Sequence, residues 1–176
     1  GHQRLTSALA LAGRQPPTIH LARALLSVTL IEMQRFAALA EVIGAARRAL
    51  ELFQHFGDPV GAATAKVLVA EVQWQTSGPS ADAIALTAEA EADFAAVGDT
   101  WGQAYAAMHA IALVGYQQGP SRRAEEVGRD ALKHFEALDD PWAQAHALGM
   151  LAELAKSRGD VAEAVRRYEQ AVTAAR

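Results

Sequence analysis

The chain has no cysteine, few aromatic residues and no long hydrophobic run, and each of these absences excludes a class of protein. Without cysteine there is neither a disulfide framework nor a zinc site built on thiolates. The apolar runs are only a few residues long, far short of the roughly 20 residues that span a bilayer. The first residues lack the positive and apolar regions of a signal peptide, so the sequence predicts a cytoplasmic protein.

The residues that are present favour a helical protein. Hydrophobic residues make up 51% of the chain, which is enough for a folded core and too much for a disordered segment. Alanine, the strongest helix former, accounts for 41 of the 176 residues, whereas strand-favouring residues are sparse. The net charge of −4 argues against a nucleic-acid-binding surface. The excess of alanine, and of arginine over lysine, suits a bacterial source.

The sequence repeats with a period of 41 residues. Gly57-Asp58 recurs as Gly98-Asp99 and then as Asp139-Asp140, and Trp101 recurs as Trp142. Phenylalanine recurs at the same interval of 41 residues, at Phe53, Phe94 and Phe135. Two prolines, Pro59 and Pro141, lie two intervals apart. Because these residue types are rare, an alanine-rich chain matching itself by chance does not explain the register. The period indicates a repeated supersecondary unit.

Each unit reads as two helices. A Gly-Asp or Asp-Asp pair ends one helix and caps the next, and proline suits the first turn. Gly-Pro-Ser at 78–80 and 119–121 separates the two helices of a unit. One hairpin cannot bury its own apolar stripe, so neighbouring hairpins must stack. The predicted fold class is all-α, a right-handed superhelical solenoid of antiparallel hairpins with eight or nine helices and breaks near residues 16, 37, 58, 78, 99, 119, 140 and 159.

We predict one helical-repeat domain over residues 1–176, with repeats at about 17–58, 59–99, 100–140 and 141–176 after a partial repeat at 3–15. The chain opens inside a second helix and closes on another, whose Val165 and Val172 have no following hairpin to cover them. It is therefore expected to be a piece of a longer array. Uncovered ends promote end-to-end contact, which favours a homodimer.

Small and large residues alternate at fixed positions in the units. In the last unit these positions hold Leu148, Leu151, Ala152 and Ala155 on the first helix, then Ala164, Tyr168 and Ala171 on the second. The preceding unit matches at Met108, Ile111, Ala112, Gly119, Ala124 and Ala131. This pattern resembles the tetratricopeptide repeat (TPR), in which the small residues let the two helices approach closely. The resemblance weakens towards the N-terminus, where Ala37 replaces the glycine between helices.

The unit length of 41 exceeds the usual TPR length of about 34. Longer units joined by an aromatic residue, three residues and Gly-Asp-x-Trp, as from Phe94 to Trp101, look like the TPR arrays of certain bacterial transcriptional regulators. Those regulators are the MalT-like and other large LuxR proteins and the SARP-type proteins. The resemblance implies a protein–protein interaction region of a larger transcriptional regulator.

No motif for catalysis or for cofactor binding occurs in the sequence. The six histidines show no metal-ligand spacing, and Asp139-Asp140 is interpreted as a helix-end pair rather than a catalytic dyad. The arginine pairs Arg122-Arg123 and Arg166-Arg167 are interpreted as solvated helix faces. We therefore predict no enzymatic activity, no cofactor, no bound metal, no direct nucleic-acid contact and no membrane contact.

Because the sequence contains no catalytic motif, we expect the function to depend on the shape of the protein surface. The resemblance implies that the first helix of each unit lines a concave face, and it assigns to a binding groove there Ile31, Leu68, Val72, Gln75, His109, Leu113, Tyr116, Glu153 and Lys156. A concave apolar surface with a few polar groups is the usual kind of binding site. The alternative is that some of these residues pack inside the array or against a neighbouring helix.

Two functions stay open. In the first, the array is a non-catalytic scaffold that binds a protein or peptide partner along an extended surface. In the second, it is a sensor domain that binds a small-molecule or peptide effector in the groove and shifts a larger protein between states. A closed pocket around His109 and Tyr116 favours the sensor, whereas an open channel across three or more units favours the scaffold.

Overall fold

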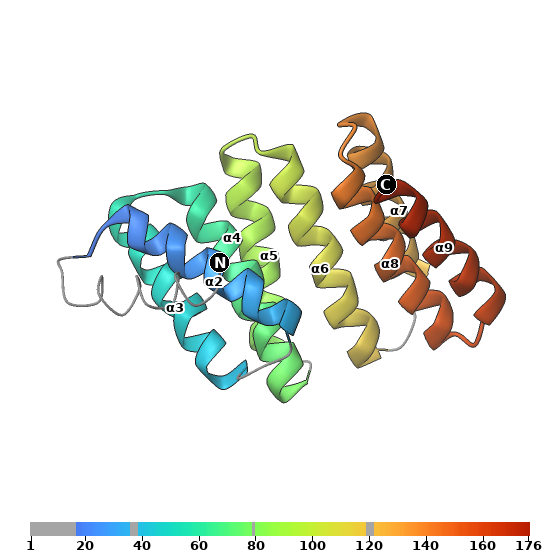
Figure 1. Cartoon of the computed structure of the whole chain (residues 1–176), viewed down its shortest axis with the longest axis horizontal. Coiled ribbons are helices and arrows are strands. Elements are labelled where there is room, and N and C mark those ends of the chain that lie inside the picture. Colours follow the sequence, from blue (N-terminus) through green and yellow to red (C-terminus); the bar gives the residue numbers. More distant parts are fainter. Residues whose placement is uncertain (1–16, 36–38, 79, 119–121) are drawn as a thin grey trace. The chain divides into compact units, whose positions relative to one another are not determined.

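The computed structural model describes residues 17–35, 39–78, 80–118 and 122–176, with the side chains of all of these except 34–35, 39–41 and 111–118. Within these ranges the chain is helical and contains no strand. The described helices are α2 (Ile19–Arg35), α3 (Leu39–Phe56), α4 (Pro59–Ser77), α5 (Ala81–Ala96), α6 (Thr100–Gln118), α7 (Arg122–Ala137), α8 (Pro141–Ser157) and α9 (Val161–Ala174) (Figure 1).

The all-α prediction is confirmed. Five of the predicted breaks, near residues 58, 78, 99, 140 and 159, fall between consecutive described helices, and the breaks near residues 37 and 119 lie outside the described residues. The break near residue 16 and the partial repeat at 3–15 lie outside the described residues.

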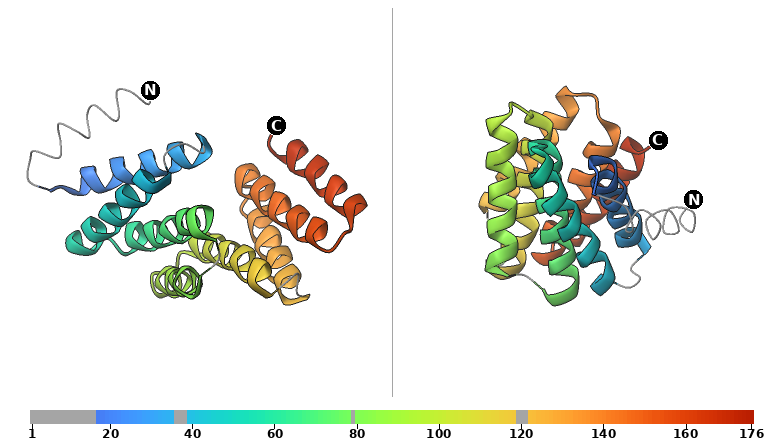
Figure 2. Two further views of the ribbon diagram at one scale, coloured as in Figure 1. Left: turned by 90° about the horizontal axis from the view of Figure 1, so that it is seen from below. Right: turned by 90° about the vertical axis from the view of Figure 1, so that its left-hand side faces the viewer.

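The helices belong to two compact units, residues 1–99 and residues 100–176. In unit 1, consecutive helices from α2 to α5 pack on one another, and the first helices of its two hairpins, α2 and α4, also touch. Unit 2 has the same arrangement over α6 to α9, with α6 touching α8 (Figures 1 and 2). Each unit therefore stacks two hairpins in the manner of a helical solenoid. That the chain forms one continuous domain stays a prediction.

The Gly-Asp and Asp-Asp pairs close one helix and open the next by a recurring geometry. Gly57, Gly98 and Asp139 adopt φ values of 68°, 73° and 51°, the left-handed conformation that ends a helix. The next backbone N–H donates to the carbonyl of the repeating phenylalanine, at 2.9, 2.9 and 3.1 Å from Phe53, Phe94 and Phe135. The carboxylates of Asp58 and Asp140 then accept from the amides of Gly61 and Ala143 at 2.9 and 3.0 Å. The predicted role is confirmed for Gly57-Asp58 and Asp139-Asp140, and Gly98-Asp99 is confirmed as the end of α5.

The repeated apolar residues form the cores. The three phenylalanines are at most 1% exposed. In unit 1 one cluster surrounds Phe53 and Leu52, and a second contains Met33, Val42, Leu68 and Val72. In unit 2, Leu151 and Leu154 of α8 pack on Ala124 of α7. Burial of these side chains is the main stabilising term for both units.

Gly61→Ala is expected to lower the free energy of unfolding by about 1–3 kcal/mol. A Cβ at Gly61 would lie 2.3 Å from Cδ1 of Phe53, and that ring is 1% exposed and fixed in the core. Urea titration followed by circular dichroism measures the change.

Gly44→Ala is the matched control, because Gly44 also lies inside a helix but a Cβ there meets no atom within 4 Å. Alanine at this position is expected to stabilise the protein by up to about 1 kcal/mol through helix propensity. Equal effects of the two substitutions would contradict the close contact between α4 and Phe53.

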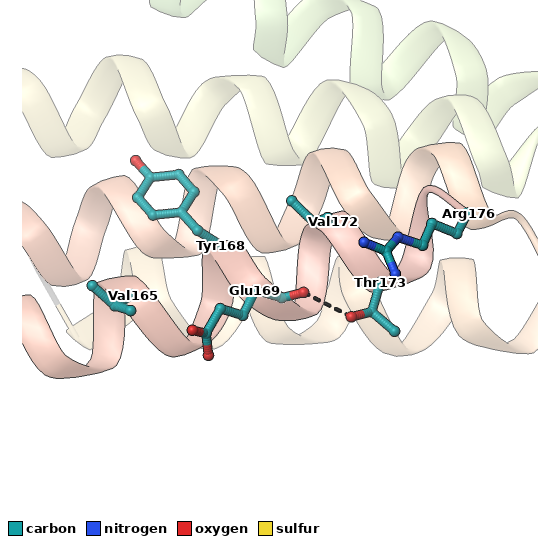
Figure 3. A pocket seen from close by; sticks show the side chains of 6 residues that line it. All are labelled: Val165, Tyr168, Glu169, Val172, Thr173 and Arg176. Atoms are coloured by element: carbon teal, nitrogen blue, oxygen red, sulfur yellow. Dashed lines mark hydrogen bonds between the residues drawn. The ribbon is translucent and has the colours of Figure 1, made fainter.

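The outer face of α9 carries an exposed apolar stripe. Val161, Val165, Tyr168 and Val172 are 65, 49, 38 and 57% exposed. Figure 3 shows three of these side chains beside Glu169, Thr173 and Arg176, with which they line a pocket. The prediction that Val165 and Val172 are left uncovered is confirmed for the described chain, whereas the homodimer stays a prediction.

Candidate functional site

Aromatic and histidine side chains gather on the first helices of unit 2. Trp101, Tyr105 and His109 follow one another at four-residue spacing on α6, and Trp142 and His146 do the same on α8. A spacing of four residues keeps side chains on one side of a helix. The 41-residue repeat places Trp142 level with Trp101 and His146 level with Tyr105, and α6 touches α8. We call these five residues the aromatic face.

The five rings form a continuous set of contacts. Within α6 the rings of Trp101 and Tyr105 are stacked, with centroids 5.1 Å apart and planes 12° apart. Within α8 Trp142 stacks on His146 at 5.4 Å and 13°. Between the helices, Trp101 and Trp142 are 6.4 Å and 25° apart, and His109 lies 5.3 Å from His146. Such packing holds each ring in a fixed orientation.

The junction before α8 anchors this face. Asp140 accepts the backbone amide of Ala143 with Oδ1, and its Oδ2 accepts the indole Nε1–H of Trp101 at 2.8 Å. Behind Trp101 lies the ring of Phe135, 6.0 Å away. The residue that begins α8 therefore also orients a ring on α6.

Exposure increases across the aromatic face from α6 to α8. Tyr105 and His109 are each 6% exposed, Trp101 and His146 are partly buried, and Trp142 is 55% exposed. Burial lowers the pKa of His109 to about 4, because the interior disfavours the imidazolium. His109 is therefore neutral at neutral pH. Trp142 is the member of the set that a partner in solution can reach most readily.

The aromatic face is poor in charge. Apart from the two histidines, α6 contains no acidic or basic residue, and α8 contains only Glu153 and Lys156, about two turns beyond His146. The carboxylates of Asp139 and Asp140 lie at the start of α8. Among the described residues no group of acidic residues and histidines is arranged to hold a metal ion. The chemistry that this surface offers is stacking and apolar contact.

The structure distributes the predicted groove residues over different environments. Leu68 and Val72 are fully buried in the second core cluster of unit 1, so the alternative reading, that they pack inside, is correct for these two. Ile31 is 40% exposed, and the amide of Gln75 donates to Glu71 at 3.5 Å. The side chains of Leu113 and Tyr116 lie outside the described residues.

At the end of α8, Glu153 pairs with Lys156 at 3.1 Å and accepts from the Tyr168 hydroxyl of α9. The hydrogen bond from Tyr168, with a smaller contribution from Lys156, keeps the pKa of Glu153 below its ordinary value despite partial burial. These side chains join α8 to α9. Of the predicted groove residues, His109 alone is in the aromatic face.

Sequence reasoning missed four members of this face: Trp101, Tyr105, Trp142 and His146. The register of Trp101 and Trp142 served only to establish the repeat. The feature of the sequence that could have identified them is the four-residue spacing of aromatic and histidine residues on two helices that lie one repeat apart. Helices related in this way touch in both units, so equal positions on them come together.

A buried ionic network links α7, α9 and the end of α8. Glu125 accepts from Arg167 at 2.6 Å, and it also pairs with Arg129 at 3.0 Å and with Arg158. The side chains of Arg167 and Glu125 are only 9 and 10% exposed. The interpretation of Arg166-Arg167 as a solvated face is therefore wrong for Arg167, because the packing of α9 turns it inwards to the carboxylates of Glu125 and Glu163.

No protein-family model matches the chain, and no curated protein sequence matches it. A solved structure described as "Podosopora anserina putative kinesin light chain nearly identical TPR-like repeats" is similar over 98% of this chain and 84% of that one, with a TM-score of 0.61 and 12% identity. A second crystal structure with the same description of its repeats covers the same shares at a TM-score of 0.64 and 12% identity.

At this identity the likeness concerns the fold. The chain has a TPR-like helical-repeat fold. In the part of the chain that the structure describes, no helix is both long and apolar enough to cross a membrane.

Proposed function

We propose that the chain is a non-catalytic module that binds a protein or peptide partner through the aromatic face of unit 2. The observation that carries the proposal is Trp142, a 55% exposed ring held in place by Trp101 and His146. Large aromatic side chains dominate the energy of many interfaces, and a ring that is already oriented loses little entropy on binding. Stacked helical hairpins also present neighbouring first helices side by side, which suits an extended ligand.

Selection of displayed peptides against the whole chain tests the proposal. Trp142→Ala is expected to weaken binding of the selected peptides about tenfold or more, because it removes the exposed anchor of the interface. The dissociation constants are measured by calorimetry, and circular dichroism checks that the variant keeps its helical signal.

Leu138→Ala is the control, since Leu138 is an apolar side chain of the same unit with a similar exposure of 47%. Its replacement is expected to leave binding unchanged. Peptides that bind equally well to the Trp142 variant would show that the partner surface lies elsewhere, and a failure to select any peptide would count against a peptide-binding module.

We also propose that this module is the regulatory or interaction region of a larger bacterial transcriptional regulator. The support is the resemblance of its junctions, such as Gly98-Asp99-Thr100-Trp101 after Phe94, to those of the large LuxR and SARP-type regulators. A helix–turn–helix domain encoded in the same reading frame would support this setting. A reading frame that encodes the array without such a domain would contradict it.

The sensor function remains the alternative. His109 and His146 lie 5.3 Å apart at the buried end of the aromatic face and would be the polar contacts of a small effector. A low-molecular-weight ligand that displaces the selected peptides, and that loses affinity on Tyr105→Ala, would favour the sensor over the scaffold.

A further inference from the structure

The charge around the aromatic face indicates the kind of side chain that it accepts. We propose that the exposed ring of Trp142, stacked with the partly buried rings of His146 and Trp101, receives an arginine or lysine side chain from a basic segment of the partner protein. This inference rests on the proposed function and specifies the chemistry of its ligand.

The stacking of the rings determines which aromatic surface a ligand can reach. The planes of Trp142 and His146 are 13° apart, and those of Trp142 and Trp101 are 25° apart. Rings at these angles and distances stack on one another rather than lie in one plane, so the aromatic surface that a ligand can reach belongs mainly to Trp142, which is 55% exposed. A guanidinium group is planar and stacks on such surfaces, and an ammonium group is attracted to the same ring faces.

The charged residues nearest to these rings in the sequence are acidic. Helix α6 has no aspartate, glutamate, lysine or arginine, and α8 has none from Pro141 to Ala152. The acidic residues at the start of α8 are Asp139 and Asp140, and among the described residues neither makes an ion pair with a lysine or arginine. Several cations of unit 2 are held elsewhere, by Glu125, Asp130 and Glu153. A cationic ligand therefore meets carboxylates at the start of α8, whereas α6 and this part of α8 offer an anionic ligand no lysine or arginine.

A hydrogen bond joins the carboxylate of Asp140 to the indole of Trp101. Oδ2 of Asp140 lies 2.8 Å from the indole Nε1, in the charge-assisted range. A carboxylate at the positive edge of an indole polarises the ring and makes its face more attractive to a cation. The helix cap at Asp140 thus joins an acidic group to the aromatic surface.

A synthetic peptide array tests the proposal. Each peptide is made in four versions that differ only at the central residue, which is arginine, lysine, citrulline or glutamate. Citrulline keeps the planar shape of arginine without its charge. The arginine and lysine versions are expected to bind the whole chain about 3- to 30-fold more tightly than the citrulline version. The glutamate version is expected to bind most weakly.

Two variants test whether the preference for a cationic side chain depends on the ring of Trp142 and on the charge of Asp140. Trp142→Leu keeps an apolar side chain but removes the ring, and it is expected to abolish the preference for arginine over citrulline. Asp140→Asn keeps a good helix cap while removing the charge, and it is expected to reduce that preference. Asp58→Asn, the equivalent cap of α4 in unit 1, is the matched control and is expected to have no effect.

The outcomes separate this proposal from the proposed function. Peptides that depend on Trp142 but bind with arginine and citrulline equally well would overturn the cationic ligand and leave the peptide-binding module intact. Tightest binding of the glutamate version would likewise overturn it. If no peptide of the array binds, both proposals fall. A preference for arginine that survives Trp142→Leu would place the cation site away from these rings and overturn the proposal.

Discussion

Glu125→Ala is expected to lower the free energy of unfolding by about 2–4 kcal/mol, because it removes one of the two carboxylates that hold the buried Arg167 and leaves only Glu163. Glu125 bonds Arg167 at 2.6 Å and pairs with Arg158, and Arg167 is 9% exposed. Burial alone would raise the pKa of Glu125, but the hydrogen bonds from Arg158 and Arg167 outweigh it and keep that pKa below its ordinary value. Urea unfolding at neutral pH measures the loss.

Glu126→Ala is the matched control, since this neighbouring glutamate pairs with Arg122 on an exposed helix surface at 3.3 Å. Its loss is expected to cost less than about 0.5 kcal/mol. The double variant Glu125→Leu with Arg167→Leu is expected to recover much of the lost stability, because it removes the charge and its partner together. A Glu125→Ala protein within about 1 kcal/mol of the unaltered chain would show that water reaches the network.

Acidification from pH 7 to pH 5 is expected to lower the free energy of unfolding by about 2 kcal/mol through His109 alone. Burial holds the pKa of His109 at about 4 in the folded chain, against 6.5 for an ordinary histidine. Between pH 6.5 and pH 4 this histidine binds a proton in the unfolded chain but not in the folded chain. Its contribution to the free energy of unfolding is therefore fully present above about pH 6.5 and is lost as the pH decreases towards 4. Over the whole window the loss amounts to about 3 kcal/mol.

His109→Gln is expected to remove this part of the pH dependence, which is measured from urea midpoints at pH 7, 6 and 5. The test window lies above the range in which carboxylates with lowered pKa values, such as Glu125 and Glu153, lose their charge. His55→Gln on the exposed side of α3 is the control, because that ring is accessible to water in the folded and unfolded chain alike. If the free energy of unfolding of the His109→Gln protein falls with pH as steeply as that of the unaltered chain, the pH dependence does not come from His109.

The candidate site could be predicted only in part. The TPR resemblance located binding on the first helices, and it included His109, which does belong to the aromatic face. It also included Leu68 and Val72, which are fully buried. A period of 41 residues says which positions are equivalent, but it does not say which of them face solvent. That depends on how closely α2 and α3 pack on α4, and the second core cluster of unit 1 shows that they enclose both side chains.

The sequence by itself determined the helices and their breaks. Asp58, Asp140 and Pro141 act on the backbone within a few residues, so their effect is local and can be read from the chain. Only the tertiary structure decided the environment of side chains that meet across helices. Arg166 and Arg167 are neighbours in sequence, yet Arg167 is buried against Glu125, 42 residues away. Trp101 and Trp142 pair for the same reason, because the charge, burial and contacts of a side chain depend on the helix packed beside it.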